Sequence, residues 1–155
     1  MAPNTKRVFY VKYVAAPIYL EILGRRPDVQ VDRLENDSPA AIAEPVLAAA
    51  HAYQIGAARD EIATQYHATE SLLARAPNLL AVSSNGAGFD PVDVDACTAA
   101  GVIAVNQAGG NKEAVAEHVM AMMLTLSKRI VETDRFMRRE ARTAELARRA
   151  AASRR

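Results

Sequence analysis

Residues 79–90 read Leu79-Leu80-Ala81-Val82-Ser83-Ser84-Asn85-Gly86-Ala87-Gly88-Phe89-Asp90, an apolar run that passes into a loop of small residues. The apolar run predicts a short buried strand, and Pro91, directly after the loop, is well placed to begin a helix. We expect Asp90 to cap that helix and Gly101 to end it. The stretch therefore predicts one unit of strand, loop and helix.

The same alternation continues on both sides of this unit. Beside the strand at 79–83, apolar or β-branched runs predict strands at residues 7–14, 29–34, 52–55 and 102–106. The first and last runs are almost continuously apolar, which is typical of strands covered on both faces. Helices are expected at 17–26, at 39–51 with Ser38 as N-cap and Pro39 first in the helix, and within 60–76. These elements predict an α/β fold, a flavodoxin-like open parallel sheet of about five strands with flanking helices, whose ligands bind at the carboxyl ends of the strands.

Composition restricts the class of protein further. The chain has 155 residues, a net charge of +1 and 50% hydrophobic residues, as expected for a soluble globular domain. A single cysteine, Cys97, excludes an internal disulfide, and together with three scattered histidines it predicts no metal site. The N-terminus lacks a signal-peptide pattern and no apolar run is long enough to span a membrane, so we expect a cytoplasmic protein.

The composition changes after Gly110. All seven glycines and all seven prolines lie at or before this residue, so one long helix is predicted over 111–150, capped by Asn111. Apolar residues at helical spacing mark one stripe of it: Val115, Val119, Met122, Met123, Leu126, Ile130 and Met137.

The end of the chain is basic. Residues 1–127 hold 9 Lys and Arg against 14 Asp and Glu, whereas residues 128–155 hold 10 against 4, with Arg154 and Arg155 at the very end. We interpret this end as a solvated helix face. Contact with nucleic acid or acidic lipid is the less favoured alternative, because Phe136 is the only aromatic residue after Gly110.

Two loops are candidates for chemistry. Gly86 and Gly88 permit a close approach of the backbone, so the amides of their loop are candidates for binding an anion. A plain connecting turn is the alternative, and spacing alone favours it. The second loop, 105–111, offers the uncharged side chains of Asn106, Gln107 and Asn111, which either orient a polar ligand or hold the turn.

Neither loop contains a nucleotide-binding motif. Pro91 stands where the third glycine of G-x-G-x-x-G belongs, and no Walker-type sequence leads to Lys112. His118 lies near the second loop, but its neighbour Glu117 points about 100° away on a helix, so a structural role is favoured for this histidine.

The segments around both loops resemble the D-isomer-specific 2-hydroxyacid dehydrogenases, a family that includes 3-phosphoglycerate dehydrogenase and glyoxylate reductase. The similar segments follow the family's order and spacing: Pro77-Asn78-Leu79-Leu80, Gly86-Ala87-Gly88-Phe89-Asp90 with Val92-Asp93, Ala100-Gly101-Val102-Ile103-Ala104-Val105-Asn106, and Asn111 with Val115-Ala116-Glu117-His118. A weaker resemblance extends over residues 1–137. It implies that residues 1–110 are the substrate (catalytic) domain of the family and that residues 111–155 are a linking helix with a basic tail.

The resemblance also implies site residues. Loop amides hold the substrate carboxylate in the family, which implies a substrate site at Asn85, Gly86, Ala87, Gly88 and Asn106. The resemblance places three residues at the cleft facing the nicotinamide of NAD(P): Asn111, Val115 and Glu117.

The family's Rossmann fingerprint, its ribose-binding acid and its catalytic arginine, carboxylate and histidine have no counterpart among these residues. We therefore assign no catalytic residue, expect no tight binding of NAD(P), and expect a truncated dehydrogenase that is inactive alone. The implied partners are a small 2-hydroxy or 2-keto carboxylate and either a homodimer through residues 113–137 or a missing cofactor domain. The alternative is a non-catalytic binding or assembly module that oligomerises through its exposed long helix.

Overall fold

A computed structural model describes residues 5–152, except for the side chains of residues 147 and 149–152. Arg154 and Arg155 of the predicted basic end therefore lie outside the described residues, as does the side chain of Arg149. The chain divides into two compact units, Met1–Gly110 and Asn111–Arg155, and each is described by itself.

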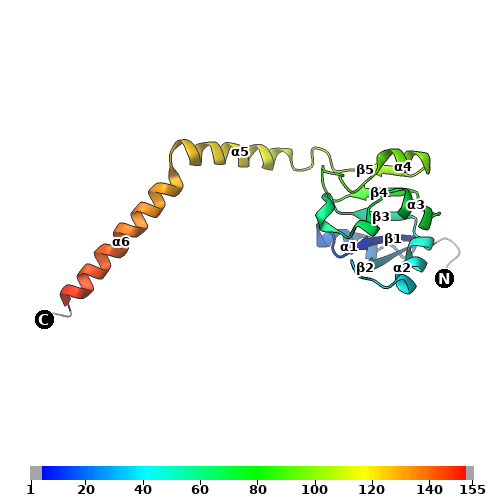
Figure 1. The fold of residues 1–155 in the computed structure, drawn as a ribbon, viewed down its shortest axis with the longest axis horizontal. Helices are drawn as coiled ribbons and strands as arrows, with labels where there is room; N and C mark the ends of the chain where they lie inside the picture. Colours follow the sequence, from blue (N-terminus) through cyan, green and yellow to red (C-terminus); the bar gives the residue numbers. More distant parts are fainter. Residues whose placement is uncertain (1–4, 153–155) are drawn as a thin grey trace. The chain divides into compact units, whose positions relative to one another are not determined.

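The first unit is built on a five-stranded parallel sheet (Figure 1). Its strands are β1 (Lys6–Val11), β2 (Val29–Leu34), β3 (Ala52–Ile55), β4 (Ala81–Ser84) and β5 (Ile103–Val105). They lie in the order β2-β1-β3-β4-β5, which is the flavodoxin-like order and confirms the predicted fold class. Because all neighbours are parallel, the carboxyl ends of the five strands share one edge.

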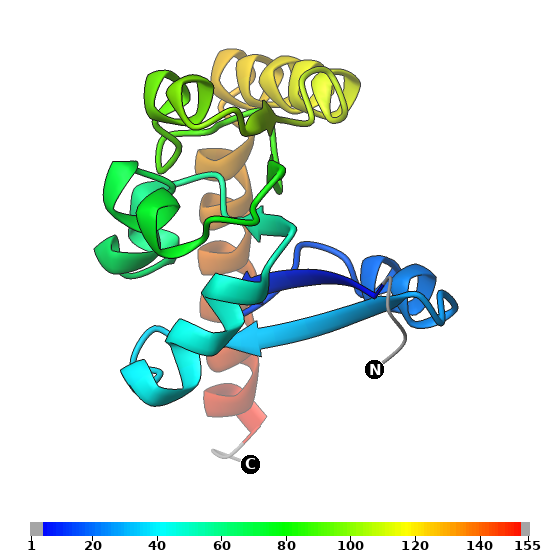
Figure 2. The same cartoon turned by 90° about the vertical axis from the view of Figure 1, so that its right-hand side faces the viewer.

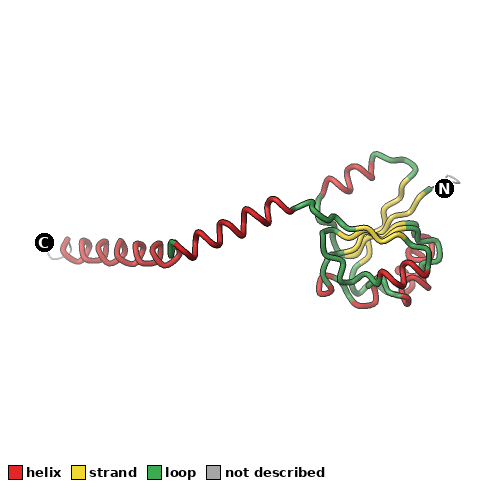
Figure 3. The backbone as a smooth tube through the Cα atoms, turned by 90° about the horizontal axis from the view of Figure 1, so that it is seen from above, coloured by secondary structure: helices red, strands yellow, loops and turns green. Residues whose placement is uncertain are grey.

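The helices are distributed unequally over the two faces of the sheet. Helix α1 (Pro17–Gly24) lies on one face, and α2 (Ala40–Ala49), α3 (Glu70–Arg75) and α4 (Val94–Ala99) lie on the other (Figures 2 and 3). The chain reverses direction across the sheet after β2, so right-handed crossovers require this one-against-three arrangement. Between β3 and α3 the chain forms two 3₁₀ turns, η1 (Arg59–Glu61) and η2 (Thr64–Tyr66).

The core lies between the sheet and α2–α4. Phe9 of β1 stacks on Tyr53 of β3 with ring centroids 4.1 Å apart, and both rings are buried. The hydroxyl of Tyr53 donates to the carbonyl of Tyr66 at 2.9 Å, and burial raises the pKa of this phenol far above its ordinary value. Leu34, Leu47 and other aliphatic side chains complete the cluster.

Several predicted boundaries were wrong. β1 ends at Val11 instead of residue 14, because Lys12 adopts a positive φ of 67° and leaves the ladder. The helix α2 starts one residue late, with Pro39 as its N-cap, while the Ser38 hydroxyl accepts from the Glu35 amide in the preceding turn. α1 ends at Gly24 instead of residue 26.

The cap of α4 was also predicted wrongly. Asp93, not Asp90, is the N-cap, and its carboxylate accepts from the Ala96 amide at 2.9 Å. Before it the chain forms a turn in which the Val92 amide donates to Phe89 O, and Ala68 then bridges to Val92: the Ala68 amide donates to Pro91 O and the Asp93 amide donates to Ala68 O. Gly101 ends the helix at a φ of +71°, as predicted.

The expectation that the last strand is covered on both faces was wrong. All three residues of β5 are exposed, with Ile103 at 64% and Val105 at 47%. β5 is the edge strand, and within the first unit no helix follows it.

The second unit holds two helices where one was predicted, α5 (Lys112–Ser127) and α6 (Ile130–Ala152) (Figure 1). The break lies at Arg129, which has a φ of 51° although it is not a glycine. An Arg129–Glu132 ion pair and a bond from the Thr133 hydroxyl to Arg129 O hold the new helix start. Asn111 is the N-cap of α5, but its side chain makes no capping hydrogen bond.

The observed cap of α4 can be tested by matched substitutions. Asp93→Ala should lower the free energy of unfolding by about 1 kcal/mol, because the Ala96 amide loses its acceptor. Asp90→Ala should change it by less than about 0.5 kcal/mol, as for an exposed surface position. Urea denaturation followed by circular dichroism measures both, and an equal loss in the two variants would contradict the assignment.

Candidate functional site

The candidate site is the 85–90 loop, which leaves the carboxyl end of β4. Its three central carbonyls are all hydrogen-bonded within the first unit. Gly86 O accepts from the Gln107 amide at 2.9 Å, and Ala87 O accepts from Asn106 Nδ2 at 2.8 Å. Gly88 O accepts a short hydrogen bond from the Ser84 hydroxyl.

The amides of the same loop are free to bind a ligand. In a trans peptide the N–H points opposite to the preceding C=O, and no described peptide is cis. The N–H groups of Ala87 and Gly88 therefore point away from the 106–107 segment that their neighbouring carbonyls contact. Together with Phe89 they form three consecutive N–H groups that have no hydrogen-bond partner among residues 5–152. Such a run of amides is suited to a carboxylate or phosphate.

Gly86 and Asn85 stand at the start of this run. The Gly86 amide has only a long 3.4 Å contact with the Ser84 hydroxyl. The Asn85 amide donates to Ile55 O at 2.9 Å, and Asn85 Oδ1 accepts from Gln54 Nε2 at 2.7 Å. The implied use of the Asn85 backbone amide for an anion therefore does not fit the structure, and Asn85 instead ties the loop to β3.

The loop packs directly on Ala57, which follows β3. A Cβ added to Gly86 would lie 3.3 Å from the Ala57 side chain, and one added to Gly88 would lie 3.3 Å from Ala57 O. Ala57 O also accepts from the Asp90 amide at 3.2 Å. The two glycines are thus needed for this close approach of two loops.

Asn106 lies beside the loop, and both polar atoms of its side chain form hydrogen bonds with backbone groups. Its Nδ2 donates to Ala87 O, and its Oδ1 accepts from the Ala108 amide at 3.3 Å. The structure places Asn106 beside the other predicted substrate residues. Its side-chain hydrogen bonds are made to the backbone and orient the loop.

A groove of about 390 Å³ lies on the β5 side of the loop. Its lining is apolar except for one amide: Phe89, Val94, Ala104, Val105 and Asn106. The Gly88 amide points away from Asn106, so this groove offers apolar contact and is separate from that amide.

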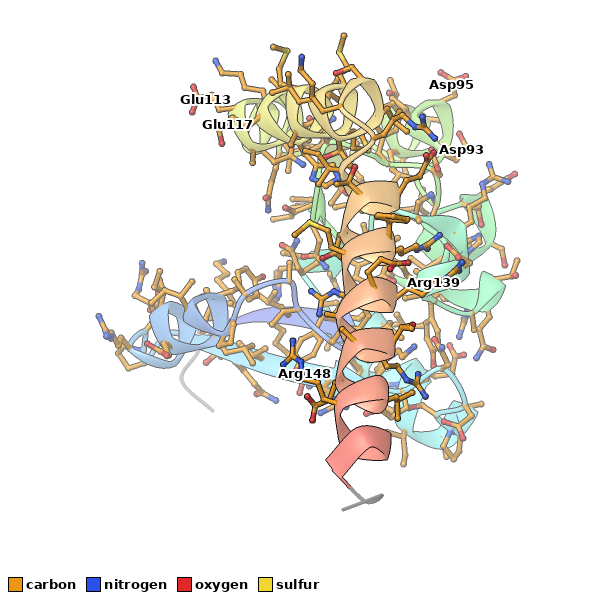
Figure 4. All side chains as sticks on the ribbon, turned by 90° about the vertical axis from the view of Figure 1, so that its left-hand side faces the viewer. Asp93, Asp95, Glu113, Glu117, Arg139 and Arg148 are labelled. Carbon is orange, nitrogen blue, oxygen red and sulfur yellow. The ribbon has the colours of Figure 1, made fainter. Side chains whose placement is uncertain are left out.

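The three residues predicted to face a cofactor, Asn111, Val115 and Glu117, belong to the second unit. Val115 is exposed, and Glu117 lies one turn after Glu113 on α5, where both carboxylates project from the same side (Figure 4). Their contact with a nicotinamide stays a prediction from the family resemblance.

The sequence analysis missed Ser84 and Glu61. Ser84 was readable in principle, because it is two residues after Val82 in the strand and shares its buried face. Glu61 lies in a 3₁₀ turn, and its carboxylate accepts from the Ala58 amide at 3.2 Å. No periodic pattern marks a residue of that kind.

Two further classes of site are absent from the described part of the chain. It contains no cluster of three or more side chains suited to a metal ion. Among its helices none combines the length and the apolar character needed to cross a bilayer.

Comparison with known proteins places this arrangement in a family. The model of the family described as D-isomer specific 2-hydroxyacid dehydrogenase, catalytic domain, matches residues 15–153 of this chain. The chain belongs to this family. The D-3-phosphoglycerate dehydrogenase of Mycobacterium leprae is 46% identical over 67 residues, which is 43% of this chain and 13% of that enzyme.

Solved structures support the same membership. The 2-hydroxyacid dehydrogenase of Ketogulonicigenium vulgare Y25 has a TM-score of 0.69 and 26% identity, over 87% of this chain and 40% of its own. The D-lactate dehydrogenase of Aquifex aeolicus, solved with NAD and lactic acid, has a TM-score of 0.58 and 27% identity, over 77% of this chain and 33% of its own. This chain thus spans less than half the length of these relatives.

The role of Ser84 in holding the loop can be tested by stability. Ser84→Ala removes the donor to Gly88 O and should lower the free energy of unfolding by about 1 kcal/mol, the usual net value of one hydrogen bond. Ser83→Ala, the neighbour on the other face of the strand, is the control and should cost less. Chemical denaturation compares them, and a larger loss in the control would refute this role.

Proposed function

We propose that this chain is the carboxylate-binding half of a D-2-hydroxyacid dehydrogenase and that the 155-residue chain alone does not transfer hydride. The observation that carries the first part is the run of three unpartnered amides at Ala87, Gly88 and Phe89. The substrate class is a small 2-hydroxy or 2-keto acid, supported by family membership and by the lactic acid in the Aquifex aeolicus enzyme. We also propose a cytoplasmic location, which agrees with a sequence that has one cysteine and therefore no internal disulfide.

The fixed carbonyls make the amides selective for an anion. Because Gly86 O, Ala87 O and Gly88 O are all occupied, the loop cannot turn a carbonyl toward the ligand without breaking a hydrogen bond. A carboxylate accepts bonds from such amides, whereas a neutral amide ligand gains less because its oxygen carries no charge.

The segment after the candidate loop does not suit the pyrophosphate of NAD(P). Pro91 has no N–H to offer, and the 90–93 segment pairs with Ala68 where a dinucleotide site would open a helix. Holding the cofactor against the substrate is the protein's main contribution in such enzymes, so no hydride transfer is expected here. Asn111, Val115 and Glu117 are proposed to face a nicotinamide supplied with another domain or chain.

Amide chemical shifts test the carboxylate site. In ¹⁵N spectra, D-lactate, glyoxylate and 3-phosphoglycerate should each move the signals of Ala87, Gly88 and Phe89, with dissociation constants on the order of millimolar, near −4 kcal/mol. The Asn85 amide, already bonded to Ile55 O, should move less. Lactamide is the neutral control and should leave the loop unchanged.

An absorbance assay at the NADH band tests the second part of the proposal. The chain with NADH and glyoxylate should show no oxidation above background, and NADH should give no heat in a calorimetric titration. Turnover would show that a complete active site exists here. In the amide-shift experiment, loop signals that none of the three acids moves would reject the carboxylate site.

A second candidate function, an assembly module, is favoured by the surface of α5. From Val119 to Leu126 every residue except Thr125 is apolar, and the large side chains are exposed, Leu126 by 78%. A helix that is apolar on all sides is normally buried. We therefore propose that residues 113–137 pair with a second copy, or with a cofactor domain where one is present.

Light scattering at low and high micromolar concentration tests this pairing. The chain should shift from monomer toward dimer mass as concentration rises, and Leu126→Glu should weaken the shift because it buries a charge at the contact. Ala144→Glu, an exposed position on α6 outside residues 113–137, is the control and should leave the shift unchanged. A mass that stays monomeric across the range would reject the homodimer.

A further inference from the structure

The orientation of the three amides depends on a contact chain that runs across the carboxyl edge of the sheet. Its first link is Ala57, on which Gly86 and Gly88 pack and whose carbonyl accepts from the Asp90 amide. Any movement of Ala57 therefore moves the amide-bearing loop.

The second link is the Glu61 carboxylate, which holds the turn that contains Ala57. Its Oε2 accepts from the Ala58 amide at 3.2 Å, and it occupies the space where a Cβ on Gly56 would stand. Residues on both sides of Ala57 are thus in contact with one carboxylate.

The third link is Tyr13, which comes from the end of β1. Beside partial burial, the charge of the Glu61 carboxylate raises the pKa of the Tyr13 phenol, so the two groups lie near each other where β1 and β3, two neighbouring strands of the sheet, end. The positive φ of Lys12 turns the chain so that Tyr13 leaves the strand. Partial burial and the charges of Glu61 and Asp60 raise the pKa of Tyr13, and the Lys12 ammonium lies 5.9 Å from the centre of its ring.

We propose that Glu61 is a positioning residue for the carboxylate site, holding the 56–58 turn so that the 85–90 loop presents its amides. This inference rests on the proposed function, because it concerns the same site. It assigns Glu61 no contact with the substrate and no proton transfer.

Three variants separate the role of the carboxylate from its charge. Glu61→Ala removes the acceptor, and Gly56→Ala leaves the carboxylate in the chain but displaces it from the turn. Glu61→Gln keeps an oxygen that accepts from Ala58. Glu21→Ala, which removes an exposed carboxylate from α1, is the control for net charge.

The readout is D-lactate affinity, measured from the amide shifts of Ala87 and Gly88. Glu61→Ala and Gly56→Ala should weaken this affinity by about tenfold. A tenfold loss is the lower end of what is observed for metal affinity when a residue that orients a metal ligand is removed. The D-lactate affinity of Glu61→Gln and Glu21→Ala should stay near that of the unmodified chain. Unchanged affinity in Glu61→Ala, or a loss in Glu61→Gln as large as in Glu61→Ala, would overturn the proposal.

Phenol titration provides a readout independent of ligand. The difference in tyrosinate absorbance between the chain and Tyr13→Phe isolates Tyr13, and its pKa should fall in Glu61→Ala and Glu61→Gln because the negative charge is lost. An unshifted Tyr13 would refute the proximity of Glu61. If no acid moves the loop amides in the unmodified chain, the proposed function fails, and this titration still decides whether Glu61 lies near Tyr13.

Discussion

The packing of two glycines against Ala57 is the constraint on which the candidate site depends. At this point two backbone segments, from the ends of β3 and β4, approach so closely that a Cβ on either glycine would lie 3.3 Å from an atom of Ala57. The approach fixes the direction of the peptide planes in the 85–90 loop, and the hydrogen bonds from Asn106, Gln107 and Ser84 then occupy the carbonyls. The loop is left with a surplus of donors, which is the electrostatic basis of anion binding.

The two units of the chain have opposite surface chemistry. In the first, the large apolar side chains are mostly buried under α2–α4, and the candidate site consists of backbone groups. In the second, α5 exposes large apolar side chains between Val119 and Leu126, whereas α6 carries ion pairs such as Arg138–Asp134 along its surface. Figure 4 shows charged side chains such as Arg139 and Arg148 on α6. The first unit can be understood from its own contacts, while the apolar side chains of α5 are left exposed.

Periodicity was sufficient to predict the sheet, because short apolar runs such as Val8-Phe9-Tyr10-Val11 indicate strands, but the exposed run in β5 shows that periodicity did not predict burial. It could not predict where the ladder stops, since that depends on the positive φ of Lys12, nor the start of α4, since Ala68 comes from a distant segment. The break at Arg129 was missed because no glycine or proline marks it. In the site, the glycines indicated an amide loop, but only the tertiary contact with Ile55 showed that the Asn85 amide is already used.

The sequence separation of the residues around the candidate loop also bears on the order of folding. The residues that shape the loop come from segments near positions 13, 57–61, 84–90 and 106, which are far apart in the chain. Closing such long loops is slow compared with forming helices or local turns, so the amides reach their final orientation only when the sheet is complete. A carboxylate ligand would therefore bind the fully folded chain and not its partly folded forms, and would stabilise the folded state by mass action.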